Sequence, residues 1–155
     1  MIALKQILVP TDFSEPSQVA VRYGVALAEA FQAQLHIVHV LETPFNQVLV
    51  SEVYVPPPPN MFAEWEKNAQ DALERVLAPA DRQKCRAELV LRHGNPYLEI
   101  IDYAKSKDID LIVMGTHGRG GMAHLLMGST AERVVRKSPC PVLTVRHPEH
   151  EFVTP

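Results

Sequence analysis

Apolar runs of strand length recur along the chain and are separated by longer amphipathic segments. Residues 6–10, 33–42 and 108–115 are almost continuously apolar, which is typical of strands buried on both faces of a sheet. Residues 85–96 alternate apolar and polar positions, so this strand is expected at a sheet edge and exposed on one side. A last strand is predicted at 141–146.

Helical periodicity predicts four helices between these strands. The first has Ser14 as its N-cap. Its expected apolar face comprises Val19, Tyr23, Ala26, Leu27, Ala30 and Phe31. The apolar face of the second comprises Trp65, Ala69, Ala72, Leu73, Val76 and Leu77. The third helix is expected from about Pro96 to Lys107, and the fourth starts at Ser129, where Ser-x-x-Glu with Glu132 predicts a capping box.

Strands that alternate with helices predict an α/β fold in which right-handed crossovers join parallel strands. With the alternating strand at one edge, the strand order 3-2-1-4-5 follows, and helices cover both faces of one open five-stranded sheet. We expect a single Rossmann-like domain over residues 1–147 and a flexible C-terminal tail over residues 148–155.

Composition narrows the functional classes. The 155 residues are 46% hydrophobic and 21% charged with a formal net charge of -3, as in an ordinary soluble domain. No run is dense in Lys and Arg, so neither DNA nor RNA is expected as a partner. Lys5 and Gln6 interrupt the N-terminal apolar stretch, which argues against a signal peptide or membrane span and for a cytoplasmic protein. Cys85 and Cys140 are interpreted as two ordinary thiols.

Five of the seven glycines lie within residues 115–128. Gly115 and Gly118 follow a predicted strand, where positive φ angles would let backbone N–H groups turn inward and form an anion nest. Gly128 would let a ligand lie against the first turn of the last helix, where free N–H groups favour phosphate. Ser129 adds a hydroxyl group there, and the pattern as a whole indicates a polyphosphate site.

Other interpretations of these residues stay open. The glycines could form a plain flexible loop, and Gly120 and Gly121 have no assigned contact. A Walker A loop requires a lysine that follows none of these glycines. Residues 118–123 fit the dinucleotide pattern G-x-G-x-x-A, but they follow the fourth strand instead of the first. Asp12, after the first strand, could be a ligand or only a helix-entry residue.

The chain resembles the universal stress protein family in three segments. These are the glycine pattern with the spacing G-x2-G-x9-G-[ST], "ILVPTDFS" at residues 7–14 and "SPCPVLTVR" at residues 138–146. The resemblance covers about residues 5–146. It implies an adenine nucleotide alpha hydrolase-like fold with strand order 3-2-1-4-5, ATP binding in the motif-bearing members, and a homodimer.

The resemblance also implies roles for individual residues. Pro10, Thr11 and Asp12 would lie beside adenine and ribose, with Asp12 accepting from ribose hydroxyl groups, and Val40 would contact the base. The other residues implied to line the nucleoside and phosphates are Met114, Gly115, His117, Gly118, Arg119, Gly128, Ser129 and Thr130, of which His117 and Arg119 occupy variable positions in the family. A Mg²⁺ ion held mainly by the phosphates is expected to accompany ATP.

Binding without fast turnover is the predicted function, in a stress-response regulator. The sequence contains no G-x-S-x-G motif, and Asp12 is the only acidic residue placed in the crevice. A slow ATP hydrolase or nucleotidyl-transfer enzyme and a nucleotide-free dimeric scaffold are the alternatives. The dimer is expected through the apolar edge strand around Val142 to Val145. The sequence identifies neither the stress, nor the downstream partner, nor the role of the proline-rich loop 42–61.

Two pairs of histidines were candidate metal ligands. His36 and His39 lie three residues apart in a strand and therefore face opposite sides, so we interpret them as core or surface residues. His147 lies directly before the tail and His150 lies within it, and only weak adventitious metal binding is expected of them.

Overall fold

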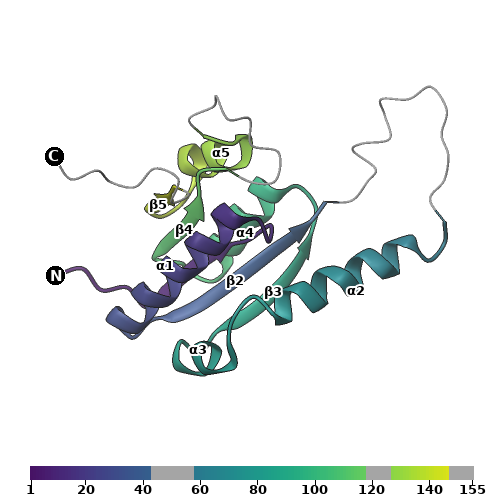
Figure 1. The fold of residues 1–155 in the computed structure, drawn as a ribbon. Coiled ribbons are helices and arrows are strands. Elements are labelled where there is room, and N and C mark those ends of the chain that lie inside the picture. Colours follow the sequence, from purple (N-terminus) through teal and green to yellow (C-terminus); the bar gives the residue numbers. More distant parts are fainter. Residues whose placement is uncertain (43–57, 118–126, 147–155) are drawn as a thin grey trace, which may run out of the picture.

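The computed structural model describes residues 1–42, 58–117 and 127–146 (Figure 1). The strands of these ranges are β1 (Gln6–Pro10), β2 (Gln34–Leu41), β3 (Glu88–His93), β4 (Leu111–Gly115) and β5 (Val142–Val145). They form one parallel sheet in the order β3-β2-β1-β4-β5. The predicted order is confirmed, and so is the edge position of β3.

The helices of the described ranges are α1 (Glu15–Phe31), α2 (Met61–Glu74), α3 (Pro79–Lys84), α4 (Pro96–Ser106) and α5 (Ser129–Lys137). Four of them match the predicted helices. The sequence did not predict α3, because this single short helix buries none of its residues and so leaves no apolar periodicity.

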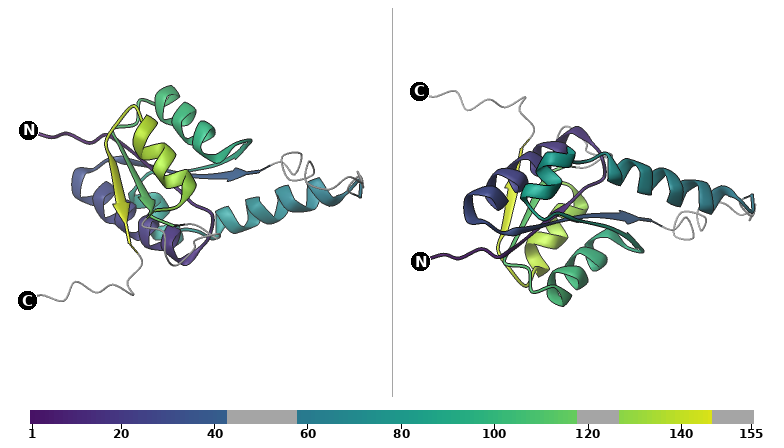
Figure 2. Two further views of the ribbon diagram at one scale, coloured as in Figure 1. Left: turned by 90° about the horizontal axis from the view of Figure 1, so that it is seen from above. Right: turned by 90° about the horizontal axis from the view of Figure 1, so that it is seen from below.

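The helices form two layers around the sheet (Figure 2). One apolar cluster joins α1 and α2 to one face of the sheet, where Ile7, Val9 and Ile37 are fully buried. The second cluster joins α4 and α5 to the other face, where Leu8 and Val38 are fully buried. Successive residues of β1 and β2 thus belong to opposite cores, which explains why these strands are apolar throughout.

The face that α1 buries differs from the predicted one. Tyr23 is 51% exposed and Phe31 is 42% exposed, so both were wrongly placed in the core. Val19 is buried as predicted, and the rest of the buried face carries small or β-branched residues, namely Ser17, Ala20, Val21, Gly24 and Ala28. Close approach to the sheet is the physical reason, since a Cβ atom at Gly24 would collide with the side chain of Val9.

Only the C-terminal part of α2 packs on the sheet. Leu73 is fully buried, whereas Trp65 is 37% exposed and its predicted core position is wrong. The N-terminal turns of α2 extend beyond the sheet (Figure 1), and Phe62 and Trp65 contact each other there in an edge-to-face pair. Residues 43–57 of the predicted proline-rich loop and the predicted tail at 148–155 lie outside the described residues. None of the described helices is both long and apolar enough to cross a membrane.

Candidate functional site

The strand order reverses between β1 and β4, the neighbouring central strands. In an open parallel sheet, ligands bind outside the carboxyl ends of the strands at such a point. The segments that follow β1 and β4 begin with Thr11 and Thr116, and both of these residues are buried. The fold therefore brings together the two segments that the sequence singled out.

The turn after β1 is held by its own side chains. The backbone N–H of Thr11 donates to the carbonyl oxygen of Val38 at 2.9 Å, and its Oγ1 accepts from the N–H of Phe13 at 3.1 Å. The Thr11 hydroxyl also lies 3.1 Å from that of Ser17. Ser14 is the N-cap of α1, as predicted. Thr11 therefore fixes the path of the chain from β1 into α1.

Asp12 takes part in the same turn. Its Oδ1 accepts from the N–H of Ser14 at 3.0 Å and also from the Ser14 hydroxyl group. These are the bonds of a helix-entry residue, the simpler of the two roles that the sequence left open. They also orient the half-buried carboxylate, and an ionised carboxylate has lone pairs for further donors. The helix-entry role is therefore compatible with a second role in ligand binding.

Gly115 is the last residue of β4. The prediction that it adopts a positive φ angle is wrong. Among the described glycines only Gly94 has a positive φ angle. Gly115 is required for space instead, because a Cβ atom there would lie 3.0 Å from the backbone carbon and oxygen of Pro16. The first turn of α1 therefore packs directly against the end of β4.

A hydrogen bond joins the end of β4 to the start of α5. The N–H of Thr116 donates to the carbonyl oxygen of Val145 at 3.1 Å, and its carbonyl oxygen accepts from the N–H of Gly128 at 2.6 Å. His117 is half-buried, and its Nδ1 lies 3.0 Å from the Thr116 hydroxyl oxygen. Thr116 was not among the residues predicted from the sequence, although a β-branched hydroxyl residue directly after a buried strand is a recognisable signal. Gly118 and Arg119, together with residues 120–126, lie outside the described residues.

The N-terminus of α5 has no capping side chain, so the predicted capping box is wrong. Gly128 is the N-cap, with φ -70° and ψ 157°, and Ser129 is the first residue of the helix. Glu132 instead pairs with Arg136 at 2.9 Å. In the part of the chain that the structure describes, Ser129 and Thr130 donate their backbone N–H groups to no other residue. These open N–H groups and the helix dipole make this terminus suited to an anion.

Val40 and Met114 supply apolar surface on the α4–α5 side of the sheet. Met114 is 6% exposed and Val40 is half-buried, and both pack in the same cluster. They come from the two strands that flank β1, and Pro10, at the end of β1, is buried between them. Met127, which the sequence analysis did not select, packs against the same cluster one residue before Gly128. An apolar wall therefore lies beside the open terminus of α5.

The two strand histidines face opposite sides of the sheet, as predicted. His39 Nδ1 lies 2.8 Å from the carbonyl oxygen of Thr11, and its ring contacts that of Phe13 on the α1 side. His36 lies on the α4 side, 2% exposed. Within the described ranges no three His, Cys, Asp or Glu side chains gather into a metal site.

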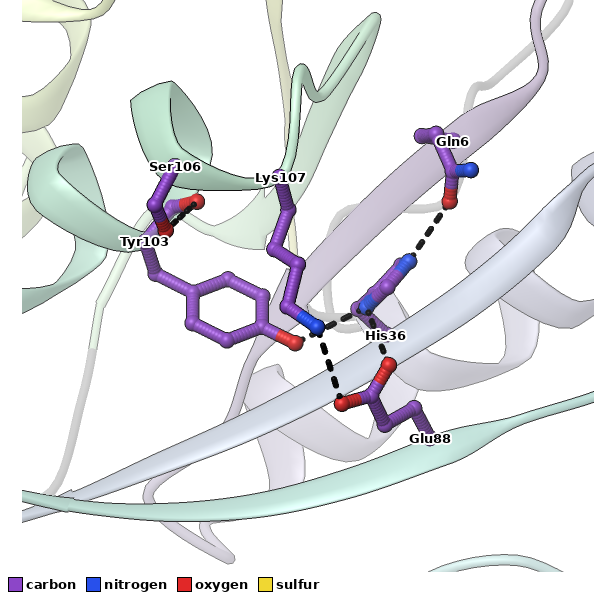
Figure 3. A network of polar contacts seen from close by, with 6 residues as sticks. All are labelled: Gln6, His36, Glu88, Tyr103, Ser106 and Lys107. Atoms are coloured by element: carbon purple, nitrogen blue, oxygen red, sulfur yellow. Dashed lines mark hydrogen bonds and ion pairs between the residues drawn. The ribbon is translucent and has the colours of Figure 1, made fainter.

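A polar network surrounds His36 toward the amino-terminal end of the sheet (Figure 3). Its Nε2 lies 2.7 Å from Gln6 Oε1 and its Nδ1 lies 2.9 Å from the Tyr103 hydroxyl oxygen. With Nε2–H donating to Gln6, Nδ1 accepts from Tyr103, which describes a neutral imidazole. Burial lowers the pKa of His36, although Glu88 opposes this shift, and burial raises the pKa of Tyr103 to about 12. Lys107 pairs with Glu88 at 3.3 Å and completes the network.

The two cysteines are free thiols, as interpreted from the sequence. Cys85 is buried and Cys140 is half-buried. Burial raises the pKa of both thiols, which disfavours the reactive thiolate form. Neither thiol is therefore placed as a nucleophile.

Comparison with known proteins gives a consistent result. The model of the universal stress protein family matches residues 3–146. A universal stress protein of Methanocaldococcus jannaschii is 33% identical over 155 residues, covering 95% of this chain and 85% of the relative. A universal stress protein of Bacillus subtilis is 34% identical over 145 residues, covering 91% of this chain and 98% of the relative.

Solved structures share the fold. The universal stress protein UspA of Lactobacillus plantarum superposes with a TM-score of 0.71 at 27% identity, covering 94% of this chain and all of that chain. Two structures that share the fold at lower identity were solved with nucleotides. One is a universal stress protein in complex with cAMP (23% identity, TM-score 0.65), which covers 94% of this chain and 99% of its own. The other, from Archaeoglobus fulgidus, is in complex with dAMP (20% identity, TM-score 0.59) and covers 93% and 98%.

Proposed function

The chain belongs to the universal stress protein family, and we propose that it binds an adenine nucleotide, ATP above all, where β1 and β4 end. The observation that carries the proposal is the N-terminus of α5, where a glycine N-cap leaves the first-turn N–H groups without a side-chain partner. The structures solved with cAMP and dAMP support an adenine nucleotide as the ligand.

The proposed roles follow from the position of each residue. Phosphate oxygens accept from the open N–H groups at Ser129 and Thr130, while Gly128 keeps a side chain away from them. The adenine ring packs on Val40 and Met114. A Mg²⁺ ion would be held mainly by the phosphates, because the described residues offer no cluster of protein ligands.

At the β1 side of the site, the oriented carboxylate of Asp12 accepts from ribose hydroxyl groups, beside Pro10 and Thr11. The loop residues Gly118 and Arg119 contribute to phosphate binding in this proposal, and His117 lies at the base of their loop.

We propose binding with at most slow hydrolysis. Asp12 already accepts two hydrogen bonds from Ser14, so its orientation is fixed by the turn instead of by an attacking water molecule. A general base needs a lone pair aimed at the proton that it removes. This arrangement favours a nucleotide-responsive regulator over a fast hydrolase.

Calorimetric titration with ATP tests the nucleotide site. We expect saturable binding to the wild-type protein, no measurable binding to Gly128→Val, and weakened binding to Asp12→Asn. Asp71→Asn on α2 is the matched control, because it removes the same charge from an exposed side chain without described partners. Wild-type affinity in Gly128→Val would contradict the proposal.

Mass spectrometry of the ligand released from the purified protein identifies what is bound. Recovered ATP supports the binder, whereas ADP with turnover in solution supports the hydrolase. Recovered NAD or FAD would instead revive the dinucleotide interpretation of residues 118–123.

We also propose that two copies pair through β5. This strand lies at the edge of the sheet, and Leu143 is 39% exposed on it. An open apolar edge strand pairs readily with another chain. Leu143→Lys should therefore give a monomer in sedimentation analysis. Leu98→Lys, at an apolar side chain of α4 that is 51% exposed, should stay a dimer. A dimeric Leu143→Lys protein would place the interface elsewhere.

A further inference from the structure

A groove of about 390 Å³ lies between α1 and the C-terminal end of α2. It is lined by Phe13, Gln18, Val21, Arg22, Ala72, Arg75 and Val76. Both helices cover the same face of the sheet, opposite α4 and α5 (Figure 2). The groove therefore lies on the other side of the sheet from Val40, Met114 and the start of α5.

The two walls of the groove repeat one pattern. In α1, Val21 and Arg22 lie three and four residues after Gln18, so all three side chains share one helix face. Arg75 and Val76 have the same spacing after Ala72 and lie directly past Glu74, the last residue of α2. Each wall thus offers both apolar surface and one guanidinium group, and the described residues that line the groove include no acidic side chain.

The two guanidinium groups have no anionic partner among the described residues. Neither Arg22 nor Arg75 makes a hydrogen bond or ion pair through its side chain within residues 1–42, 58–117 and 127–146. Asp71, one helical turn before Arg75, is also unpaired there, although this spacing allows a pair. Arg82 and Arg92, in contrast, pair with carboxylates at 2.6 Å and 2.8 Å. The groove therefore concentrates positive charge that the described residues do not neutralise.

Phe13 forms the apolar end of the groove in an unusual conformation. Its φ angle is 65°, in the left-handed region that a bulky residue rarely adopts. The Thr11 hydroxyl and Gln18 Nε2 hold its backbone at 3.1 Å and 3.3 Å, and its ring contacts that of His39 with centroids 4.4 Å apart. Backbone strain of this kind persists where the surrounding structure enforces it, often at ligand sites. The ring is thereby presented to the groove in a fixed position.

We propose that this groove binds a small amphiphilic anion. The apolar body of the ligand, a flat ring system, packs against Phe13, Val21 and Val76. Its carboxylate, sulfonate or phosphate group lies between Arg22 and Arg75, whose planar guanidinium groups suit these anions. The volume suits a ligand of one or two rings, near the lower end of small-molecule sites. This site is additional to the proposed nucleotide site and uses the opposite layer of the fold.

Naphthalene-2-sulfonate is a suitable probe, because it joins a flat apolar body to one anionic group. Titration into the full-length protein, followed by backbone amide NMR, should give saturable shifts at Val21, Ala72 and Val76. Neutral naphthalene-2-sulfonamide should bind about tenfold or more weakly, because it lacks the charge that strengthens the hydrogen bonds. Equal binding of both compounds, or shifts confined to α5, would overturn the proposal.

Paired substitutions test the arginines. Arg22→Gln with Arg75→Gln should weaken binding of the sulfonate about tenfold or more, since two charge-assisted contacts are lost. Arg136→Gln with Lys137→Gln removes two charges from α5, in the opposite layer, and should leave the affinity unchanged. Equal losses in the two double variants would show that only net charge matters and would overturn the site. Circular dichroism checks that each variant is folded, as expected for exposed side chains.

Discussion

Two helices begin at the same edge of the sheet, and they begin differently. The N-terminus of α1 is closed by its own neighbours, because Ser14 caps it and Asp12 holds Ser14. The N-terminus of α5 starts at Gly128 and has no side-chain cap. Capping satisfies the orphan N–H groups within the chain, whereas a glycine leaves them for an external acceptor. The chain thus satisfies the first N–H groups of α1 itself and leaves those of α5 open to the anion that we propose.

The largest effect is expected at Gly115, where the end of β4 meets the first turn of α1. Gly115→Val would drive a branched side chain into the backbone of Pro16, which is only 3.0 Å from the position of a Cβ atom. The resulting overpacking should lower the free energy of unfolding by about 3 kcal/mol. Urea denaturation measures this loss, and an unchanged midpoint would refute the close packing of α1 on β4. Gly94→Ala is not a suitable control, because its φ angle of 135° adds strain of its own.

A capping side chain at the N-terminus of α5 tests whether phosphate uses the open N–H groups. Gly128→Ser places a capping hydroxyl at the start of α5, where it competes with phosphate for the first-turn N–H groups. We expect ATP affinity to fall about tenfold, equivalent to ~1.4 kcal/mol, while the stability of the free protein rises by a few tenths of a kcal/mol. Gly128→Ala is the control, since it adds bulk without a cap and should lower stability. A Ser variant with full affinity would show that phosphate does not use these groups.

Opening the closed terminus gives the reverse test. Ser14→Ala removes the cap of α1 and should lower the free energy of unfolding by about 1 kcal/mol, as thermal or urea unfolding would show. Ser129→Ala changes the same side chain at the first position inside α5, where it caps nothing, and should leave stability nearly unchanged. ATP affinity should respond in the opposite way, falling for Ser129→Ala more than for Ser14→Ala. Equal losses of stability in Ser14→Ala and Ser129→Ala would show that the two helix N-termini do not differ in side-chain capping.

The smallest effect comes from pH, and it acts on neither terminus. The pKa of buried His36 lies below its unfolded value of 6.5, so the unfolded chain binds this proton more readily. The contribution of His36 to stability is therefore complete above pH 6.5 and is lost as the pH falls toward the folded pKa. A plot of the free energy of unfolding against pH across this range should have a shallower slope for His36→Gln than for the wild-type protein. An identical slope would show that Gln6, Glu88, Tyr103 and Lys107 leave His36 without influence on acid stability.

The sequence predicts the strands of this fold better than it predicts the contacts of its helices. Strands buried on both faces can be recognised as apolar runs, and the alternation of apolar and polar residues in β3 identifies its edge position. The buried face of α1 was misjudged because the large side chains Tyr23 and Phe31 are exposed. The sheet lies too close to this helix for side chains of that size, and such a distance is a property of the packed layers.

For the candidate site, too, the sequence predicts the location better than the contacts. The spacing of the glycines led to the ends of β4 and α5, and the fold brings these segments beside the end of β1. The sequence did not reveal why glycine is required at each of these positions. Gly115 provides space for Pro16 without a positive φ angle, and Gly128 displaces Ser129 from the capping position. Both outcomes depend on contacts between elements that are distant in sequence, which local patterns do not encode.

The bond between the carbonyl oxygen of Thr116 and the N–H of Gly128 has a consequence for how this chain can vary. It joins the end of β4 to the start of α5 through backbone atoms alone, so substitutions of side chains in these two elements leave the connection in place. Gly128→Pro would remove it, because proline has no N–H group to donate. Side chains around the proposed site can therefore vary while the two segments that form it stay joined.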